Sequence, residues 1–345
     1  MKKKKEVLFN KKGRTILKQE LMAEPFERKT VSFYKYFQCE DPKSLRDFLF
    51  LDWAKIKVFG RIYIAHEGIN AQLSIPKNHW SDFINTLNKY PELIDIPIKR
   101  AVQEGKSFYK LTIKVREELV AYGISKDSYC MDNVGTHLSS EDYNTALENP
   151  NTIIVDMRNH YESEIGRFKG AVIPNVEKSR ELLPEVKRIL TGHEEDQVLL
   201  YCTGGIRCEK ASAYLIKSGF KDVNQLRGGI IQYAHDVKKQ KIESKFIGKN
   251  FVFDGRLGER VTDDVIAKCH ICGKSCDNHT DCKNDACHIL FIQCKNCNVD
   301  LDGCCSKECQ RFSLLPEIEQ KKLRKDPSKS VSRTFFNKRI KSKIK

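Results

Sequence analysis

The sequence contains no long apolar run, no internal repeat and no flavin or nicotinamide fingerprint, and no iron-binding triad stands out. No stretch approaches the roughly 18 apolar residues that a membrane-spanning helix needs, so we expect no membrane association. The chain begins MKKKKEVLFNKKGR, which has the positive charge of a signal peptide but lacks the apolar stretch that must follow. We therefore expect a cytoplasmic protein that is not exported.

The composition is that of a folded chain with more than one domain. Of 345 residues, 40% are hydrophobic and 31% are charged, which argues against wholesale disorder. Because one domain usually takes about 100–200 residues, we expect two or three domains.

The net charge of +15 is concentrated at the two ends of the chain. Residues 1–30 carry ten basic and four acidic side chains, and residues 316–345 carry eleven and three. Basic arms attract polyanions, because Lys and Arg near phosphates release counterions. Nucleic acid is the natural partner. The alternative is that the lysines at the solvated termini reflect only a generally Lys-rich composition and bind no partner.

Residues 31–125 have the pattern of a small α+β domain. Apolar residues alternate on both sides of Glu67 and Gly68, which indicates a β-hairpin. The neighbouring segments alternate between strand and helix composition, and the expected elements are a strand at 31–39, a helix at 42–56, the hairpin at 61–75, a helix at 78–90 and a strand at 107–115. The order β-α-β-β-α-β predicts a split-βαβ, ferredoxin-like domain.

From residue 138 to about 240, strands alternate with helices, which predicts an α/β domain with a parallel sheet covered on both faces. The segments NTIIVDMR (residues 151–158) and QVLLYC (197–202) have the short, uninterrupted apolar runs of strands buried on both sides. Helices are expected at 139–148, 181–190 and 207–218.

The segment YCTGGIRCEKASAYLIKSGF, residues 201–220, carries the strongest chemical signal. It has the pattern of a buried strand, a cysteine, two glycines, an arginine and a helix. The glycines let the backbone curl so that N–H groups point inward, and the helix directs its positive end to the same place. We therefore expect an anion cradle made by Thr203, Gly204, Gly205 and Ile206.

Cys202 is the candidate catalytic residue of this loop. Such a cradle lowers the pKa of a thiol from ~8.5 to roughly 3.5–7.5, and Arg207 adds positive charge. A persulfide on Cys202, or a substrate oxyanion, would be stabilised in the same way. The alternative is that Cys202 is a small buried side chain at a strand end. Cys208 shares a helical stripe with Ala211 and Leu215, which favours a core position over a resolving thiol.

The pattern C-x-x-G-x-R opening a helix, with VDMRNHYESEIGRFKGAVIPN about 46 residues before it, resembles a rhodanese domain. The resemblance implies a persulfide on Cys202, and the six-residue loop from Cys202 to Arg207 implies sulfur rather than phosphate chemistry. Asp156 and Arg158 match the strand-end D-x-R of the family and are expected to support the loop. One departure is Arg167, where rhodaneses commonly have a histidine.

Further motifs extend the resemblance to roughly residues 30–312. They are AHEGINAQLS, RNHYE, YCTGGIRCEKASAY, GGI and GKNFVFDGRLGER, together with the terminal cysteine cluster. The whole pattern resembles the bacterial tRNA uridine hydroxylase family, called TrhO. This resemblance implies oxygen-dependent 5-hydroxylation of the wobble uridine, position 34, in the tRNA anticodon loop, as the first step toward 5-carboxymethoxyuridine. It also implies that molecular oxygen is a co-substrate and that the loop cysteine is required.

Two other functions remain open at this point. The chain could be a general rhodanese-type sulfurtransferase that passes persulfide sulfur to an acceptor. It could also be a non-enzymatic RNA-binding protein in which the rhodanese fold is only a scaffold.

Ten of the fourteen cysteines lie between Cys269 and Cys309, and in a reducing compartment such a cluster indicates metal binding before disulfides. Two C-x-x-C pairs separated by 21 residues have nearly the spacing of a zinc ribbon, and they are Cys269, Cys272, Cys294 and Cys297. The remaining thiols leave enough ligands for a second site: Cys276, Cys282, Cys287, Cys304, Cys305 and Cys309. Structural zinc is the expectation, and an iron–sulfur cluster or disulfides are the alternatives.

The sequence thus predicts a basic N-terminal arm, a ferredoxin-like domain, a rhodanese domain, a linker with a Cys-rich metal-binding module, and a basic tail. The expected ranges are 1–30, 31–125, 138–240, 248–315 and 316–345.

Overall fold

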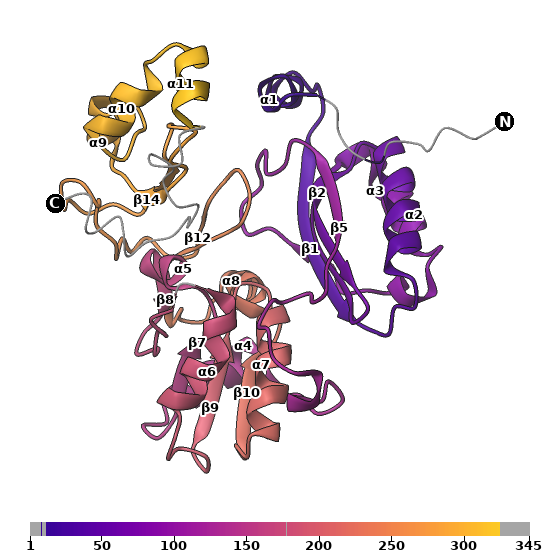
Figure 1. Ribbon diagram of the computed structural model, residues 1–345. Coiled ribbons are helices and arrows are strands. Elements are labelled where there is room, and N and C mark those ends of the chain that lie inside the picture. The colour runs from indigo at the N-terminus through magenta and orange to yellow at the C-terminus, as the bar shows by residue number, and fades with distance from the viewer. Residues whose placement is uncertain (1–7, 9–11, 177, 325–345) are drawn as a thin grey trace.

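The computed structural model describes residue 8 and residues 12–176 and 178–324. Figure 1 shows an N-terminal sheet with helices on one face, a central sheet enclosed by helices, and a C-terminal unit of short strands and helices. Parts of the expected basic arm and tail, residues 1–7, 9–11 and 325–345, lie outside the described residues. Within the described part of the chain, no helix has the length and apolar character needed to cross a membrane.

The N-terminal domain contains a five-stranded sheet in the order β4-β1-β3-β2-β5. Its elements are α1 (Arg14–Met22), β1 (Arg28–Tyr36), α2 (Pro42–Lys55), β2 (Phe59–Ala65), β3 (Gly68–Pro76), a 3-10 turn (Lys77–His79), α3 (Trp80–Leu87), a second 3-10 turn (Pro91–Leu93), β4 (Lys99–Arg100) and β5 (Leu111–Val115). Helices α2 and α3 cover one face of the sheet, and the other face is turned toward the rest of the molecule (Figure 1).

The last strand of the ferredoxin-like order is not the one that the sequence predicted. β4 pairs antiparallel with β1 and so completes the order β4-β1-β3-β2. The predicted strand at residues 107–115 does exist as β5, but it is an additional strand at the opposite edge, parallel to β2. β4 has only two residues, too few to produce a recognisable periodicity in the sequence.

Alternation along β2 and β3 gives the sheet two chemically different faces. Ile62 is fully buried in the core formed with α2 and α3. Arg61 and Tyr63 point to the opposite face, because neighbouring side chains of a strand alternate. Their partners in β3, Gln72 and Asn70, lie directly opposite them. The helix-free face is therefore polar and aromatic.

The central domain contains four parallel strands in the order β6-β10-β9-β7. After a 3-10 turn (Lys126–Ser128), its elements are β6 (Thr136–Leu138), α4 (Ser140–Ala146), β7 (Ile153–Asp156), α5 (His160–Glu164), β8 (Gly166–Phe168), α6 (Ser179–Ile189), β9 (Gln197–Tyr201), α7 (Ile206–Lys217), β10 (Asp222–Leu226) and α8 (Gly229–Gln240). Along β9, Val198 and Leu200 pack with α6 and α7, whereas Leu199 and Tyr201 pack with α4 and α8. The covered parallel sheet expected from the apolar runs is confirmed.

The C-terminal region begins at the edge of the central domain. β11 (Phe246–Asn250) pairs with β8 and with β12 (Glu259–Arg260). The rest consists of β13 (His279–Asp281), β14 (Leu290–Ile292), α9 (Lys295–Asp300), α10 (Lys307–Ser313) and α11 (Glu317–Arg324). The domain boundaries expected near residues 125–138 and 240–248 stay predictions.

Candidate active site

Cys202 directly follows β9, at the carboxyl end of the central sheet. The chain then turns at Gly205, whose φ is 101°, a conformation that residues other than glycine rarely adopt. The turn directs the N–H of Gly205 to the Cys202 sulfur at 3.1 Å, and α7 begins at the next residue. The backbone donors to the sulfur are the amides of Gly205 and Arg207. Of these, only Gly205 belongs to the four residues expected to form the cradle, which stays a prediction.

The pKa of the Cys202 thiol is lowered to about 5. Burial is the largest single influence and acts to raise this pKa, since Cys202 is fully buried. A hydrogen bond from the Cys208 thiol, the charge of Arg207 and the N–H groups of Arg207 and Gly205 together outweigh burial. The side chain is therefore a thiolate at neutral pH, the form in which cysteine is a nucleophile.

Cys208 is fully buried on α7 and packs in the core that contains Ala211 and Leu215, as the helical stripe predicted. Burial, followed by the hydrogen bond and charge of Cys202, raises the Cys208 pKa well above its ordinary value. Cys208 therefore remains protonated and serves as a hydrogen-bond donor to its neighbour. The sequence did not predict this second role.

Gly229, at the start of α8, closes the cradle from the other side. Its φ is 67°, and a Cβ at this position would lie 2.6 Å from the carbonyl oxygen of Cys202 and 2.8 Å from the nitrogen of Gly204. Such distances are not tolerated by real Cβ atoms. Only glycine therefore allows α8 to approach the loop so closely.

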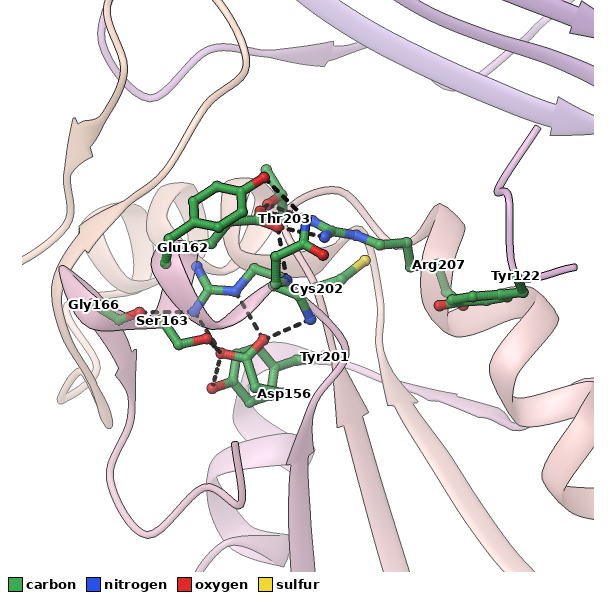
Figure 2. A network of polar contacts seen from close by, with 12 residues as sticks. Tyr122, Asp156, Glu162, Ser163, Gly166, Tyr201, Cys202, Thr203 and Arg207 are labelled. Carbon is green, nitrogen blue, oxygen red and sulfur yellow. Dashed lines mark hydrogen bonds and ion pairs between the residues drawn. The ribbon is translucent and has the colours of Figure 1, made fainter. Parts of the chain in front are cut away.

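Arg207 is held by an acid that the sequence did not single out. Its Nη1 and Nη2 donate to the two carboxylate oxygens of Glu162 at 2.7 and 3.0 Å, and Nη2 also donates to the Thr203 hydroxyl at 3.1 Å. Glu162 is fully buried and lies beside the cysteine loop (Figure 2). Its carboxylate also accepts the N–H of Asn159, so an Asn-x-x-Glu helix cap was the available sequence signal.

Asp156 and Arg158 form a fully buried ion pair, and Figure 2 shows Asp156 below the cysteine loop. Arg158 donates to both carboxylate oxygens of Asp156 at 2.9 and 2.6 Å and to the carbonyl of Gly166 at 2.7 Å. Asp156 also accepts from the hydroxyls of Ser163 and Tyr201, both at 2.7 Å. The pair thus braces β9, the strand that ends just before Cys202, and forms no hydrogen bond to the loop from Thr203 to Arg207.

A cavity of about 1220 Å³ opens above the loop. It is lined by Cys202, Thr203 and Arg207 of the central domain and by the helix-free face of the N-terminal sheet. A third wall comes from the segment after β11, including Phe253. The volume exceeds the roughly 300–1,000 Å³ of ordinary small-molecule pockets, so the site has room for part of a larger substrate.

Helix α7 joins the N-terminal and central domains through buried polar contacts. The Tyr34 hydroxyl donates to Glu209 at 2.9 Å. The fully buried Lys210 pairs with Glu67 at 3.1 Å and with Glu118 at 2.9 Å. Because these partners lie in the N-terminal half of the chain, the contacts fix the sheet over the cysteine loop.

The Cys-rich region brings its thiols together in two separate sets. In each set the four sulfur atoms lie within 4.8 Å of one another: Cys269, Cys272, Cys294 and Cys297 in the first, and Cys282, Cys287, Cys305 and Cys309 in the second. Four convergent thiols have the number and chemistry of a tetrahedral zinc site, so the residues fit a metal. The first set is the predicted one. The sequence also offered Cys276 and Cys304 as possible ligands of the second site. Neither belongs to a set, because only the other four thiols converge there.

Three family models match the chain. They are a UPF0176 acylphosphatase-like domain at residues 28–119, a rhodanese-like domain at 139–236 and a rhodanase C-terminal domain at 247–310. A solved rhodanese-like protein from Staphylococcus aureus is 21% identical over 28% of this chain and 90% of its own, with a TM-score of 0.24. The fold and the cysteine loop define a rhodanese-like protein with an acylphosphatase-like N-terminal domain.

Relatives of known name resemble the whole chain. The tRNA uridine(34) hydroxylase of Leptospira interrogans is 49% identical over 99% of this chain and 93% of its own length. That of Yersinia pestis is 48% identical over 96% of this chain and 94% of its own. The chain therefore belongs to the tRNA uridine(34) hydroxylase family, and the resemblance indicated by the sequence motifs is confirmed.

Proposed function

We propose that this protein hydroxylates carbon 5 of the wobble uridine, position 34, in the anticodon loop of tRNA, with molecular oxygen as co-substrate. The observation that carries the proposal is the 48–49% identity to tRNA uridine(34) hydroxylases over nearly the full length of both chains. The low pKa of Cys202 at the floor of a large cavity supports it independently.

Cys202 is the proposed catalytic residue. Addition of its thiolate, or of a persulfide that it carries, to carbon 6 of the pyrimidine makes carbon 5 a nucleophile toward the oxidant. Loss of the carbon 5 proton and departure of the sulfur then restore the ring. One oxygen atom enters the base, and the other leaves as water after taking two electrons and two protons from a reductant.

The surrounding residues have positioning roles in this proposal. Arg207 and the Gly205 amide stabilise the sulfur anion before it attacks and again when it leaves. Thr203, Gly204 and Ile206 shape the loop, and Asp156 with Arg158 supports the strand beneath it. A single-stranded loop is a suitable substrate, because its bases are free to turn outward into a cavity.

We also propose that each cysteine set binds one zinc ion that stabilises the C-terminal region. The apolar clusters of this region are small, and cysteines form part of both. Metal binding would therefore supply much of its folding free energy, on the order of 10 kcal/mol per site. A cytoplasmic location completes the proposal, since thiols stay reduced there.

The test is mass analysis of tRNA nucleosides from a deletion strain that carries the parent gene or the Cys202→Ser variant. We expect 5-hydroxyuridine derivatives with the parent and none with the variant. Cys130→Ser, which changes an exposed cysteine, is the matched control and should behave as the parent. Loss of thiolated nucleosides from the deletion strain would instead indicate a sulfurtransferase. If deletion changed no nucleoside, the remaining function would be non-enzymatic RNA binding.

A further inference from the structure

The helix-free face of the N-terminal sheet forms a wall of the cavity above Cys202. Strands β1, β3 and β2 are neighbours in register, so their side chains lie in rows across this face. One row consists of Ser32, Gln72 and Arg61, and the next of Tyr34, Asn70 and Tyr63. All six residues line the cavity. Side chains directly opposite in a sheet lie about 5 Å apart at Cβ, so each row is a continuous surface.

The amides in the middle of these rows have unused hydrogen-bonding groups. Asn70 and Gln72 are half-buried, yet neither side chain bonds to another of the described residues. Each amide offers both a donor and an acceptor. Groups of this kind on a cavity wall suit the edge of a nucleobase, which also presents donors and acceptors side by side.

Positive charge without an acidic partner gathers at the same cavity. Arg61, Arg116 and Arg180 line it, and within the described part of the chain none of the three forms an ion pair. The Arg116 guanidinium lies over the Tyr63 ring, 5.4 Å from its centroid. Such cations bind phosphates, and a tyrosine or guanidinium plane stacks on a base.

The acids around the cavity do not cancel this charge. Glu118 is paired with Lys210, and Asp254 and Glu259 are paired with Arg256. Among the described acids that line the cavity, only Glu117 is exposed without a cationic partner. Five arginines and four acids line the cavity, so its formal charge is positive by one. The three arginines without an ion pair in the described chain are the part of this lining that complements a polyanion.

We propose that this face, which we call the sheet platform (Arg61, Tyr63, Asn70, Gln72 and Arg116), binds the single-stranded segment of the anticodon loop that carries the target uridine. Arg61 and Arg116 bind backbone phosphates, Tyr63 stacks on a base, and Asn70 and Gln72 bond to base edges. The platform faces Cys202 across the cavity, so RNA bound there brings a base to the sulfur. The inference rests on the proposed function, because it takes tRNA as the substrate.

The test measures the affinity of an anticodon stem-loop RNA for full-length protein carrying Cys202→Ser, so that no chemistry intervenes. Arg61→Ala and Arg116→Ala should each weaken binding roughly tenfold and reduce the salt slope by about one. Asn70→Ala should weaken binding roughly fivefold with little change in the slope, since an amide contributes no counterion release. Lys55→Ala, which removes an exposed cation from α2, is the control and should bind as the parent does.

Two further measurements keep the result decisive. Arg61→Lys retains the charge and should recover most of the affinity, which a merely destabilised variant would not do. A photoreactive uridine at the target position should cross-link to β2 or β3. Unchanged affinity of the Arg61→Ala/Arg116→Ala double variant, or cross-links confined to other elements, would overturn the inference. Absence of 5-hydroxyuridine derivatives from cells that carry the parent gene would overturn the proposed function instead. The binding measurement does not depend on that result, so the two failures can be distinguished.

Discussion

The two carboxylate oxygens of Glu162 accept hydrogen bonds from both terminal nitrogens of Arg207, at 2.7 and 3.0 Å. The acid comes from α5 and the arginine from α7, so the pair ties together two helices that flank Cys202. Arg207 is consequently held in place by a neighbour and is not free to move with the substrate.

Replacing Glu162 with glutamine should destabilise the protein strongly. The substitution removes the carboxylate that pairs with Arg207 in a largely buried site, and breaking such a pair costs about 3 kcal/mol or more. Chemical denaturation measures the loss. The matched control is Glu185→Gln, which breaks an ion pair with the exposed Arg188 and should change stability little, because solvent screens such surface pairs. Equal losses in the two variants would contradict the prediction.

Alkylation of Cys202 should have a pH midpoint near 5, because its pKa is lowered to about 5. Cys208→Ala removes a hydrogen bond to the thiolate and should move the midpoint upward, whereas Cys208→Ser keeps a donor and should restore it. Rates of iodoacetamide modification across a pH series give these midpoints. A parent midpoint near that of a free thiol, ~8.5, would remove the basis for thiolate catalysis.

The same pKa has a consequence for stability. The folded protein holds Cys202 as a thiolate at a pH where the unfolded chain binds a proton. This group therefore stabilises the fold most above pH ~8.5, and its contribution disappears as the pH falls through about 5. In Cys202→Ala the free energy of unfolding should depend less on pH across this window, as denaturation of both proteins at several pH values would reveal.

Replacing Lys210 with methionine should loosen the contact between the N-terminal and central domains. The buried ammonium pairs with Glu67 and Glu118, and without it the two carboxylates repel each other. We expect a loss of about 2 kcal/mol, measured by chemical denaturation. Lys217→Met, at an exposed position on the same helix, should change stability little.

Metal analysis should find two metal ions per chain. Cys272→Ser and Cys305→Ser each remove a ligand from a different set and should each lose one ion. Cys276→Ser and Cys304→Ser change thiols outside both sets and should keep both ions. A colourless protein would indicate zinc, whereas visible absorbance would indicate an iron–sulfur cluster. Retention of two ions in Cys272→Ser would contradict the assigned ligands.

The sequence predicted most of the central domain. The uninterrupted apolar run of β9 reports burial on both faces, and the pair Gly204–Gly205 followed by Arg207 reports a turn into a helix. These are local signals, because a strand's apolar run and a glycine's freedom at positive φ depend on neighbouring residues alone. The two-residue strand β4 was missed, since it exists only through its pairing with β1.

The residues that complete the site come from distant parts of the chain. Glu162 has the sequence pattern of an ordinary helix cap, and only folding brings it to Arg207 as a buried ion pair. Likewise, alternation along β2 and β3 separates polar from apolar side chains but does not say what the polar face meets. That depends on Tyr34 and Lys210 joining the sheet to α7. Local sequence was thus enough to single out Cys202 as the candidate catalytic residue, whereas long-range packing decided which surface faces it.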